Sequence, residues 1–227
     1  IYKRKDCEIN VTTNHIIRKK MKFVISYICL FVAFSSPRHC WCYVFGSACS
    51  RIISRKEWNS RNINTTIELS VRPLPYVIIH HSAGKECFNL EECSGRVRSI
   101  QDKHIDERNW SDIGYNFLIG SDGQSYEGRG WGKIGAHAFN WNRNSVGICL
   151  MGMFTERLPT SAALRAAQKL IDCGLNIGEI GHDYKLMGHR QVVSNTACPG
   201  QALYDTIRTW QRWIPRPGNV ENNDAFR

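Results

Sequence analysis

The stretch Tyr76-Val77-Ile78-Ile79-His80-His81-Ser82 decides how this chain folds. Four consecutive large apolar residues, three of them β-branched, predict a strand that is buried on both faces. The first polar residues after such a strand emerge at the edge of the sheet, where open α/β folds bind ligands. His80 and His81 are therefore candidate ligands or catalysts. The simpler alternative, a strand-end histidine with only a hydrogen-bonding role, stays open at this point.

A second polar cluster lies far along the chain, at Gly188-His189-Arg190 and Thr196-Ala197-Cys198-Pro199-Gly200. Two imidazoles and a thiolate that meet at one point make a three-ligand zinc site with an open fourth position, which is how catalytic zinc is held. The two clusters therefore predict a metal centre, provided that the fold brings them together.

Strand-like and helical patterns alternate along the chain, which predicts a single α/β domain with a mixed sheet and helices on both faces. The turn residues and caps set the expected boundaries. The expected elements are a short strand at 51–53 that runs into a turn or helical start at Ser54, a helix over 89–105, strands at 115–120 and 125–128 joined at Asp122-Gly123, a strand at 146–151, a helix from the Thr160 cap to Cys173 with Gly174 as its stop, and a last helix over 201–213.

The chain ahead of this domain has the composition of a targeting segment. Residues 23–34 are an apolar run after the basic start Met21-Lys22, which is typical of a secretory signal peptide and short for a membrane span. The alternative is an uncleaved anchor, and only in that case would the protein be held at a membrane. We therefore expect a secreted, extracellular protein with a non-native upstream extension at 1–20, a signal peptide and linker at 21–42, one domain at 43–214 and a polar tail at 215–227.

The formal net charge of +10 overstates the basic character of the expected domain. Eight of the 30 Lys and Arg residues and two of the 20 Asp and Glu residues precede residue 43, which leaves 22 basic against 18 acidic residues, a charge of +4. A mildly basic protein favours an anionic surface or polymer, but nucleic-acid binding needs a focused basic stripe. We therefore expect no nucleic-acid partner.

The chain has ten cysteines, of which eight follow the apolar run of the signal segment, and this indicates an oxidising compartment. Cys87 and Cys93 are close enough to close a small loop at the head of a helix, and Cys49 with Cys173 is the next candidate pair. The other cysteines of interest are Cys149, expected to be a buried free thiol, Cys40 and Cys42, which are left undecided, and Cys198, which lacks an evident disulfide partner.

Six stretches, taken together, are specific to one family. They are Val77-Ile78-Ile79-His80-His81-Ser82-Ala83-Gly84, Asp112-Ile113-Gly114-Tyr115-Asn116-Phe117-Leu118-Ile119-Gly120, Tyr126-Glu127-Gly128-Arg129-Gly130-Trp131, Gly135-Ala136-His137, Tyr184-Lys185-Leu186-Met187-Gly188-His189-Arg190-Gln191-Val192 and Cys198-Pro199-Gly200. From Ile53 to Trp213 the chain resembles the peptidoglycan recognition proteins, animal relatives of the phage zinc amidases. The resemblance implies a central mixed sheet flanked by about three helices, bacterial peptidoglycan as the ligand, and a monomer.

The resemblance leaves two functional classes. The amidases of the family cut the bond between the muramic lactyl group and the first alanine of the stem peptide, whereas the receptors bind the same muropeptide without a metal. The zinc ligands of the amidases match His80, His189 and Cys198, and their assisting residues match Tyr115 and Thr196. Receptors typically replace the cysteine, so Cys198 favours a zinc-dependent N-acetylmuramoyl-L-alanine amidase of innate immunity over a non-catalytic receptor. One departure is that Cys198 follows His189 by nine positions rather than the usual eight.

The resemblance also implies a long cleft for the muropeptide. In some members an arginine that matches Arg129 grips the extra carboxylate of diaminopimelate, which favours those stems over lysine stems here. Asn109-Trp110 is a mixture of the sequence forms linked to the two stem types. The residues expected to bind substrate are His81, His104, Trp110, Arg129, Trp131, His137 and Asn142.

Overall fold

Strand β2 (Leu74–His81) lies inside a six-stranded mixed sheet with the strand order β1-β4-β3-β5-β2-β6. β5 (Ser145–Leu150) and β6 (Ile180–Gly188) flank it, and both run parallel to it. Its apolar run Val77-Ile78-Ile79 is completely buried. The predicted burial on both faces is therefore confirmed, because β2 has a strand at each edge and packed side chains above and below.

The computed structural model describes residues 49–63, 67–69 and 71–217, all within one compact unit. The predictions for the upstream extension, the signal segment, Cys40, Cys42 and most of the polar tail fall outside these residues. Among the residues that are described, none of the helices has the length and apolar character needed to cross a bilayer.

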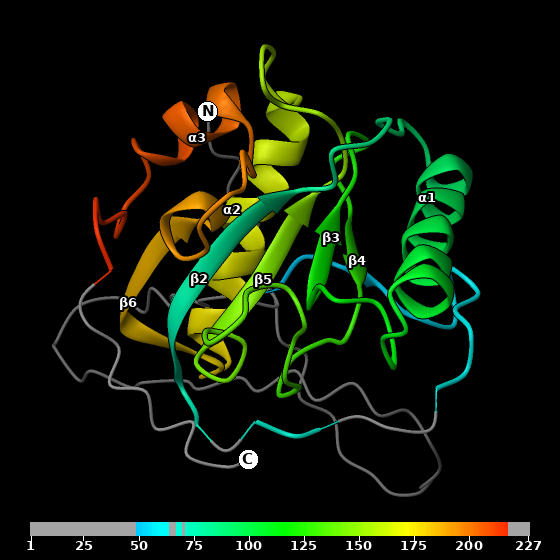
Figure 1. Cartoon of the computed structure of the whole chain (residues 1–227), viewed down its shortest axis with the longest axis horizontal. Helices are drawn as coiled ribbons and strands as arrows, with labels where there is room; N and C mark the ends of the chain where they lie inside the picture. Colours follow the sequence, from blue (N-terminus) through cyan, green and yellow to red (C-terminus); the bar gives the residue numbers. More distant parts are fainter. Residues whose placement is uncertain (1–48, 64–66, 70, 218–227) are drawn as a thin grey trace, which may run out of the picture. The chain divides into compact units, whose positions relative to one another are not determined.

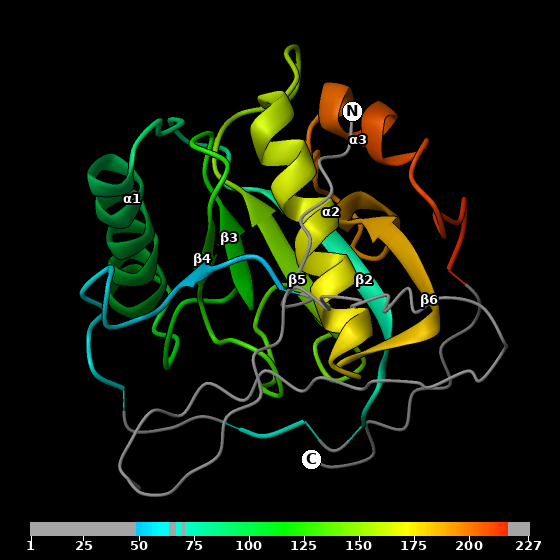
Figure 2. The same cartoon turned by 180° about the vertical axis from the view of Figure 1, so that it is seen from behind.

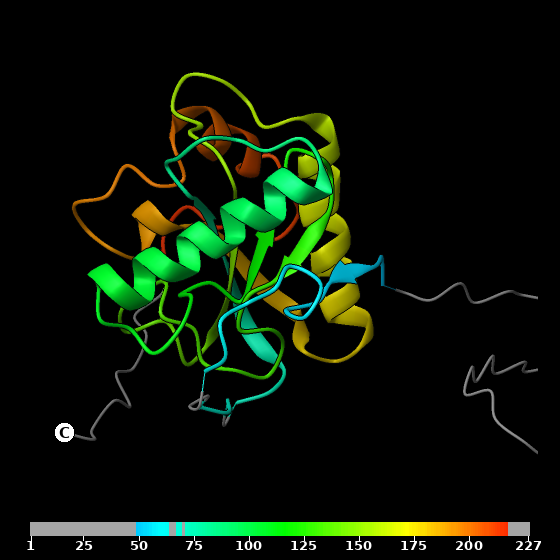
Figure 3. The same ribbon diagram turned by 90° about the vertical axis from the view of Figure 1, so that its right-hand side faces the viewer.

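Helices cover both faces of the sheet, as predicted. α2 (Ser161–Asn176) and α3 (Gln201–Ile207) pack on the face that carries Val77 and Ile79, in the larger hydrophobic core. α1 (Leu90–Asp102) packs on the other face. α2 lies behind the sheet in Figure 1 and in front of it in Figure 2, and Figure 3 shows α1 and α2 on opposite sides. These three layers confirm the α/β class.

The predicted hairpin is formed by β3 (Phe117–Ile119) and β4 (Ser125–Glu127), which pair antiparallel. Gly123 in its turn has φ +79°, a conformation that glycine adopts at little cost, and the carboxylate of Asp122 accepts a backbone N–H of the turn. β4 pairs in parallel with β1 (Ile52–Ile53), so β1 forms the edge of the sheet. The chain after β1 forms a turn rather than a helix.

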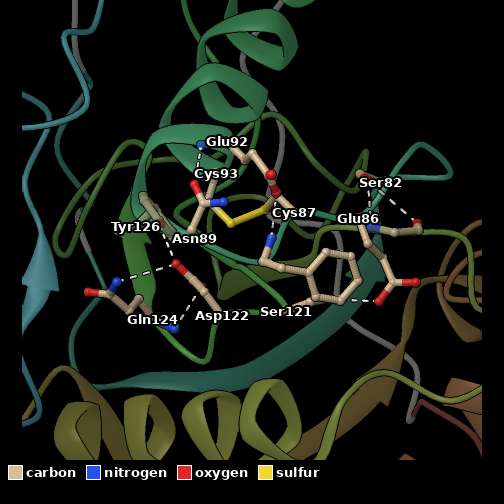
Figure 4. Close-up of a disulfide and its surroundings, with 12 residues drawn as sticks. Ser82, Glu86, Cys87, Asn89, Glu92, Cys93, Ser121, Asp122, Gln124 and Tyr126 are labelled. Carbon is tan, nitrogen blue, oxygen red and sulfur yellow. Dashed lines mark hydrogen bonds between the residues drawn. A yellow bond between two sulfur atoms is a disulfide. The ribbon is translucent and has the colours of Figure 1, made fainter.

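A disulfide fastens the start of α1 (Figure 4). Cys87 and Cys93 have Cα atoms 5.0 Å apart, and between them the side chain of Asn89 caps the helix by accepting a backbone N–H at 3.0 Å. The bridge lies beside the hairpin turn, where the hydroxyl of Tyr126 donates to Asp122 at 2.7 Å. The disulfide and the cap thus fix the residues that lead into α1.

The other described cysteines form one more disulfide and two free thiols. Cys49 and Cys173 form a second disulfide, across 124 positions of the chain, which ties the segment before β1 to α2. Cys149 is a buried free thiol, as expected, and Cys198 is also free.

Two helices end elsewhere than the sequence predicts. α2 continues through Gly174 to Asn176, and the left-handed turn is made by Gly178 at φ +74° instead. Gly174 lets α2 pack closely against β6, because a Cβ at this position would lie 2.6 Å from the side chain of Ile180. α3 stops at Ile207 rather than continuing to 213, because the chain turns back and residues 212–214 hydrogen-bond along β6.

β6 was not predicted from periodicity. Exposed residues follow each other at His182 and Asp183, so the strand has no regular alternation of apolar and polar positions. The helix expected over 89–105 is present as α1, followed by a single π-helical turn at Lys103–Glu107. That turn carries His104 toward the pocket described below.

Candidate metal centre and binding pocket

Two parallel strands end side by side and bring the candidate metal ligands together. Ile79 of β2 pairs with Gly188 of β6. His80 and His189 are the next residues along the two segments, so they lie side by side at the same edge of the sheet. Cys198 arrives from the loop that follows β6. One ligand atom from each of these three residues lies within 4.8 Å of the other two.

The spacing of these atoms fits a zinc ion. Nδ1 of His80 and Sγ of Cys198 are 3.7 Å apart, and the rings of His80 and His189 have centroids 4.4 Å apart. Two ligands on one tetrahedral zinc, at about 2.3 Å for sulfur and about 2.0 Å for nitrogen, lie roughly 3.6 Å from each other. Two imidazoles and one thiol are also a donor set that zinc favours, so these residues fit the metal that the resemblance implies.

The position of Cys198 is set by its own loop. Its Sγ accepts the backbone N–H of His81 at 3.3 Å, its backbone N–H donates to Oγ1 of Thr196 at 3.2 Å, and its carbonyl accepts the N–H of Arg190 at 2.9 Å. The nine-position interval after His189 therefore closes into a loop that still returns the sulfur to both imidazoles.

Burial sets the protonation of the three candidate ligands. The pKa of His80 is held well below its ordinary value of 6.5 by burial and then by the neighbouring histidines, and burial lowers the pKa of His189 to about 4. Both imidazoles are therefore neutral at neutral pH, as metal binding requires. Burial raises the pKa of the Cys198 thiol to about 12, so this thiol keeps its proton until a cation displaces it.

A pocket of about 490 Å³ opens over this centre. Three residues that sequence analysis did not single out, Arg108, Met153 and Thr155, contribute to its walls. No Asp or Glu of the described residues lines it, so its one guanidinium, from Arg108, is not neutralised by a carboxylate in the wall. Besides the three ligand candidates, the predicted site residues in its lining are Tyr115, Thr196, His81, His104, Trp110 and His137.

The structure places Arg129 outside the pocket lining. Its Nε donates to the carbonyl of Ile113 at 2.7 Å and its Nη1 to the carbonyl of Ile134 at 2.9 Å, so two sides of the guanidinium are used to hold the backbone. Arg108 instead faces the pocket, with its guanidinium carbon 5.1 Å from the ring centre of Trp110. The sequence signal for Arg108 was its position two residues before a tryptophan of the expected cleft.

Two further predicted binding residues also lie elsewhere. Trp131 packs against Phe117 in the larger core, with ring centroids 4.4 Å apart, so the sheet separates it from the pocket. Asn142 uses its side-chain oxygen to accept the backbone N–H groups of His137 and Ala138 at 2.8 and 2.9 Å. It therefore shapes a wall of the pocket instead of lining it.

Tyr115 stands beside the metal centre with its hydroxyl protonated. Its ring centroid is 5.3 Å from that of His80. Burial, followed by the thiols of Cys149 and Cys198, raises the pKa of its hydroxyl well above the ordinary value of 10. The hydroxyl also interacts with the buried thiol of Cys149, and it keeps its proton, and so its ability to donate a hydrogen bond, at any physiological pH.

Known proteins resemble this chain over the domain that carries the pocket. A family model described as N-acetylmuramoyl-L-alanine amidase matches residues 70–201. Peptidoglycan-recognition protein SC2 of Drosophila melanogaster is 46% identical over 162 residues, which cover 71% of this chain and 87% of that protein.

Solved structures show the same likeness. Drosophila peptidoglycan recognition protein SA is 40% identical, with a TM-score of 0.72 over 75% of this chain and 97% of that one. Peptidoglycan recognition protein-LE, solved in complex with tracheal cytotoxin, a monomeric diaminopimelic acid-type peptidoglycan, is 40% identical, with a TM-score of 0.70 over 72% of this chain and 95% of that one. On the matched domain, the shared fold and the identity to these proteins, the chain belongs to the peptidoglycan-recognition protein family.

Proposed function

We propose that this chain is a secreted, zinc-dependent N-acetylmuramoyl-L-alanine amidase that binds bacterial peptidoglycan and hydrolyses its lactyl-L-alanine amide bond in innate immunity. The observation that carries the proposal is the convergence of His80, His189 and Cys198 beneath an open pocket. Three protein ligands leave one position of a tetrahedral metal for water or substrate, which distinguishes a catalytic site from a closed structural one.

The zinc, when bound, polarises the amide carbonyl and lowers the pKa of water from 15.7 to about 7. His80, His189 and Cys198 would hold the zinc ion. The protonated hydroxyl of Tyr115 donates a hydrogen bond to the carbonyl oxygen as negative charge develops there. Thr196 already binds the backbone N–H of Cys198 through its hydroxyl oxygen, so its hydroxyl hydrogen is available to the substrate.

The pocket supports binding of a muropeptide. Trp110 and His104 form an aromatic wall, with ring centroids 4.7 Å apart, that suits sugar rings and amide planes. Peptidoglycan recognition protein-LE, which shares the fold, was solved with a diaminopimelic acid-type muropeptide. Stem peptides carry carboxylates, and Arg108 supplies a cation that the pocket does not neutralise.

A non-catalytic peptidoglycan receptor is the second candidate. The observation that favours it is the additional residue between His189 and Cys198, which departs from the usual spacing of the amidases. A receptor would use the same pocket and leave the amide bond intact.

The two candidates differ in one measurement. Purified protein is incubated with polymeric peptidoglycan in zinc buffer, with and without a chelator, and released stem peptides are quantified by mass spectrometry. Chelator-sensitive release supports the amidase. Binding of peptidoglycan in a pull-down, without any release, would overturn the amidase and leave the receptor.

A further inference from the structure

We propose that His137 is a positioning residue that holds His80 in the tautomer able to bind the metal. The inference rests on the proposed metal centre, and it concerns a residue that the resemblance had assigned only to substrate binding. The contact that motivates it is between Nε2 of His80 and Nδ1 of His137, which are 3.0 Å apart. The two rings meet edge to face, at 84°, and both residues are buried, 1% and 7% exposed.

Only one arrangement of protons in this contact is compatible with metal binding. A neutral imidazole carries a single N–H, and two ring nitrogens at 3.0 Å must share one proton between them. If His80 donates from Nε2, its Nδ1 presents a lone pair toward Sγ of Cys198, 3.7 Å away. If His137 donates instead, the proton of His80 must lie on Nδ1, where it blocks the metal. The metal-binding form of His80 therefore requires His137 to accept with Nδ1 and to carry its own proton on Nε2, a buried atom without a hydrogen-bond partner among the described residues.

Metal-binding histidines commonly donate their second N–H to a carboxylate, a backbone carbonyl or a water, and this partner fixes the ring orientation. Here the partner is a neutral imidazole from a separate loop. It fixes the direction of His80 without placing a negative charge beside the ligand.

The ring of His137 is held in a slot between two glycines. A Cβ on Gly147 of β5 would lie 2.4 Å from Cγ and Cδ2 of the ring, and a Cβ on Gly135 would lie 2.4 Å from Cδ2. No other residue type leaves room for the ring at either position. Asn142 holds the adjoining backbone by accepting the N–H groups of His137 and Ala138. The slot and the loop together aim Nδ1 at His80.

The test compares substitutions of His137 that keep or remove the acceptor. His137→Asn retains a polar atom near the position of Nδ1, whereas His137→Phe fills the slot with a ring that cannot accept. Zinc affinity is measured by competition with a chromophoric chelator, a readout independent of turnover. We expect His137→Phe to weaken zinc binding roughly 10- to 100-fold. His137→Asn should reduce the zinc affinity much less, because it keeps an acceptor.

A second readout follows the tautomer itself. In the metal-free protein, ¹⁵N NMR of the imidazoles is expected to show the proton of His80 on Nε2 in the wild type and a mixture in His137→Phe. If His137→Phe does not fold, His137→Gln replaces it, because the longer amide puts its polar atoms near Nε2 and loses the contact. Equal zinc affinity for wild type and acceptor-less variant, with an unchanged tautomer, overturns the inference.

Failure of this inference and failure of the proposed function give different results. Zinc binding that depends on His137 without hydrolysis of peptidoglycan would overturn the amidase and leave the positioning role intact. Full hydrolysis by a His137→Phe protein with unchanged zinc affinity would overturn the positioning role and leave the amidase intact.

Discussion

The Nδ1 atom of His80 lies 3.7 Å from the Sγ atom of Cys198, although 118 positions of the chain separate the two residues. The parallel strands β2 and β6 end at the same edge of the sheet, and the loop after β6 returns Cys198 to that edge, where its Sγ accepts the backbone N–H of His81. A pair of donors held at this distance by separate elements is preorganised, so a metal would not need to draw the chain together.

Replacing the sulfur tests the metal centre. Cys198→Ser is expected to lower zinc affinity and peptidoglycan hydrolysis more than about 100-fold, because loss of a ligand should exceed the usual 10- to 100-fold effect of losing a ligand's partner. Muropeptide binding should be largely kept, since the pocket walls do not depend on the thiol. Zinc content, turnover and calorimetric binding are measured together, and a variant that still hydrolyses contradicts the assigned ligand set.

Tyr115→Phe tests the proposed hydrogen bond to the reacting carbonyl. The substitution keeps the ring beside His80 and removes only the hydroxyl. We expect kcat to fall by about 100- to 1000-fold with zinc affinity unchanged, as for other donors to a developing oxyanion. Steady-state kinetics and metal competition give the two values. A loss confined to KM would assign Tyr115 to binding instead.

Arg108→Ala tests the carboxylate preference of the pocket. A charge-assisted contact with a free stem carboxylate should make binding roughly tenfold weaker when it is lost. Muropeptides whose diaminopimelate carboxylate is free or amidated are compared by calorimetry. The control is Arg165→Ala, which removes the same charge from an exposed position of α2. If the two variants lose the same affinity, the effect is one of net charge.

Gly147→Ala tests the slot that holds His137. The added methyl would lie 2.4 Å from the imidazole, so the ring or the strand must move, and overpacking of this kind costs about 1–3 kcal/mol in the free energy of unfolding. The matched control is Gly95→Ala in α1, where the nearest atom to a Cβ is 3.7 Å away and helix propensity favours alanine by roughly 0.5–1 kcal/mol. Urea unfolding of both variants is measured without metal.

The stability of the metal-free protein should depend on pH through His104. Its Nδ1 accepts the N–H of Gly114 at 3.0 Å, and burial, followed by the charges of Arg108 and Arg129, lowers its pKa to about 4. Because the folded pKa lies below the unfolded value of 6.5, the unfolded chain takes up the proton first. The stabilisation is therefore fully present above pH 6.5 and declines as the pH falls toward 4.

Other histidines titrate over the same range, so a variant isolates the contribution of His104. The unfolding free energies of wild type and His104→Gln are compared at pH 7.5 and pH 4.5. We expect the difference between them to be smaller at the lower pH. An NMR titration that places the pKa of His104 near 6.5 would contradict this expectation.

Several features of the molecule follow from local sequence alone. The apolar run before His80 predicted the buried central strand, Asp122-Gly123 predicted the hairpin turn, and Thr160 predicted the start of α2, where its hydroxyl accepts the N–H of Ala163 at 3.1 Å. Each signal acts over a few residues, through backbone conformation or burial, and therefore can be read directly from neighbouring letters.

Other features were decided only by tertiary contacts. The direction of a long side chain depends on what surrounds it, so nothing near Arg129 in sequence shows that two distant carbonyls hold its guanidinium, or that Trp131 turns into the core beneath α2. The same reason applies to the contact of His137 with His80. The sequence by itself determined which residues can bind a metal, whereas the packing of two strands and a glycine-lined slot decided where their rings lie.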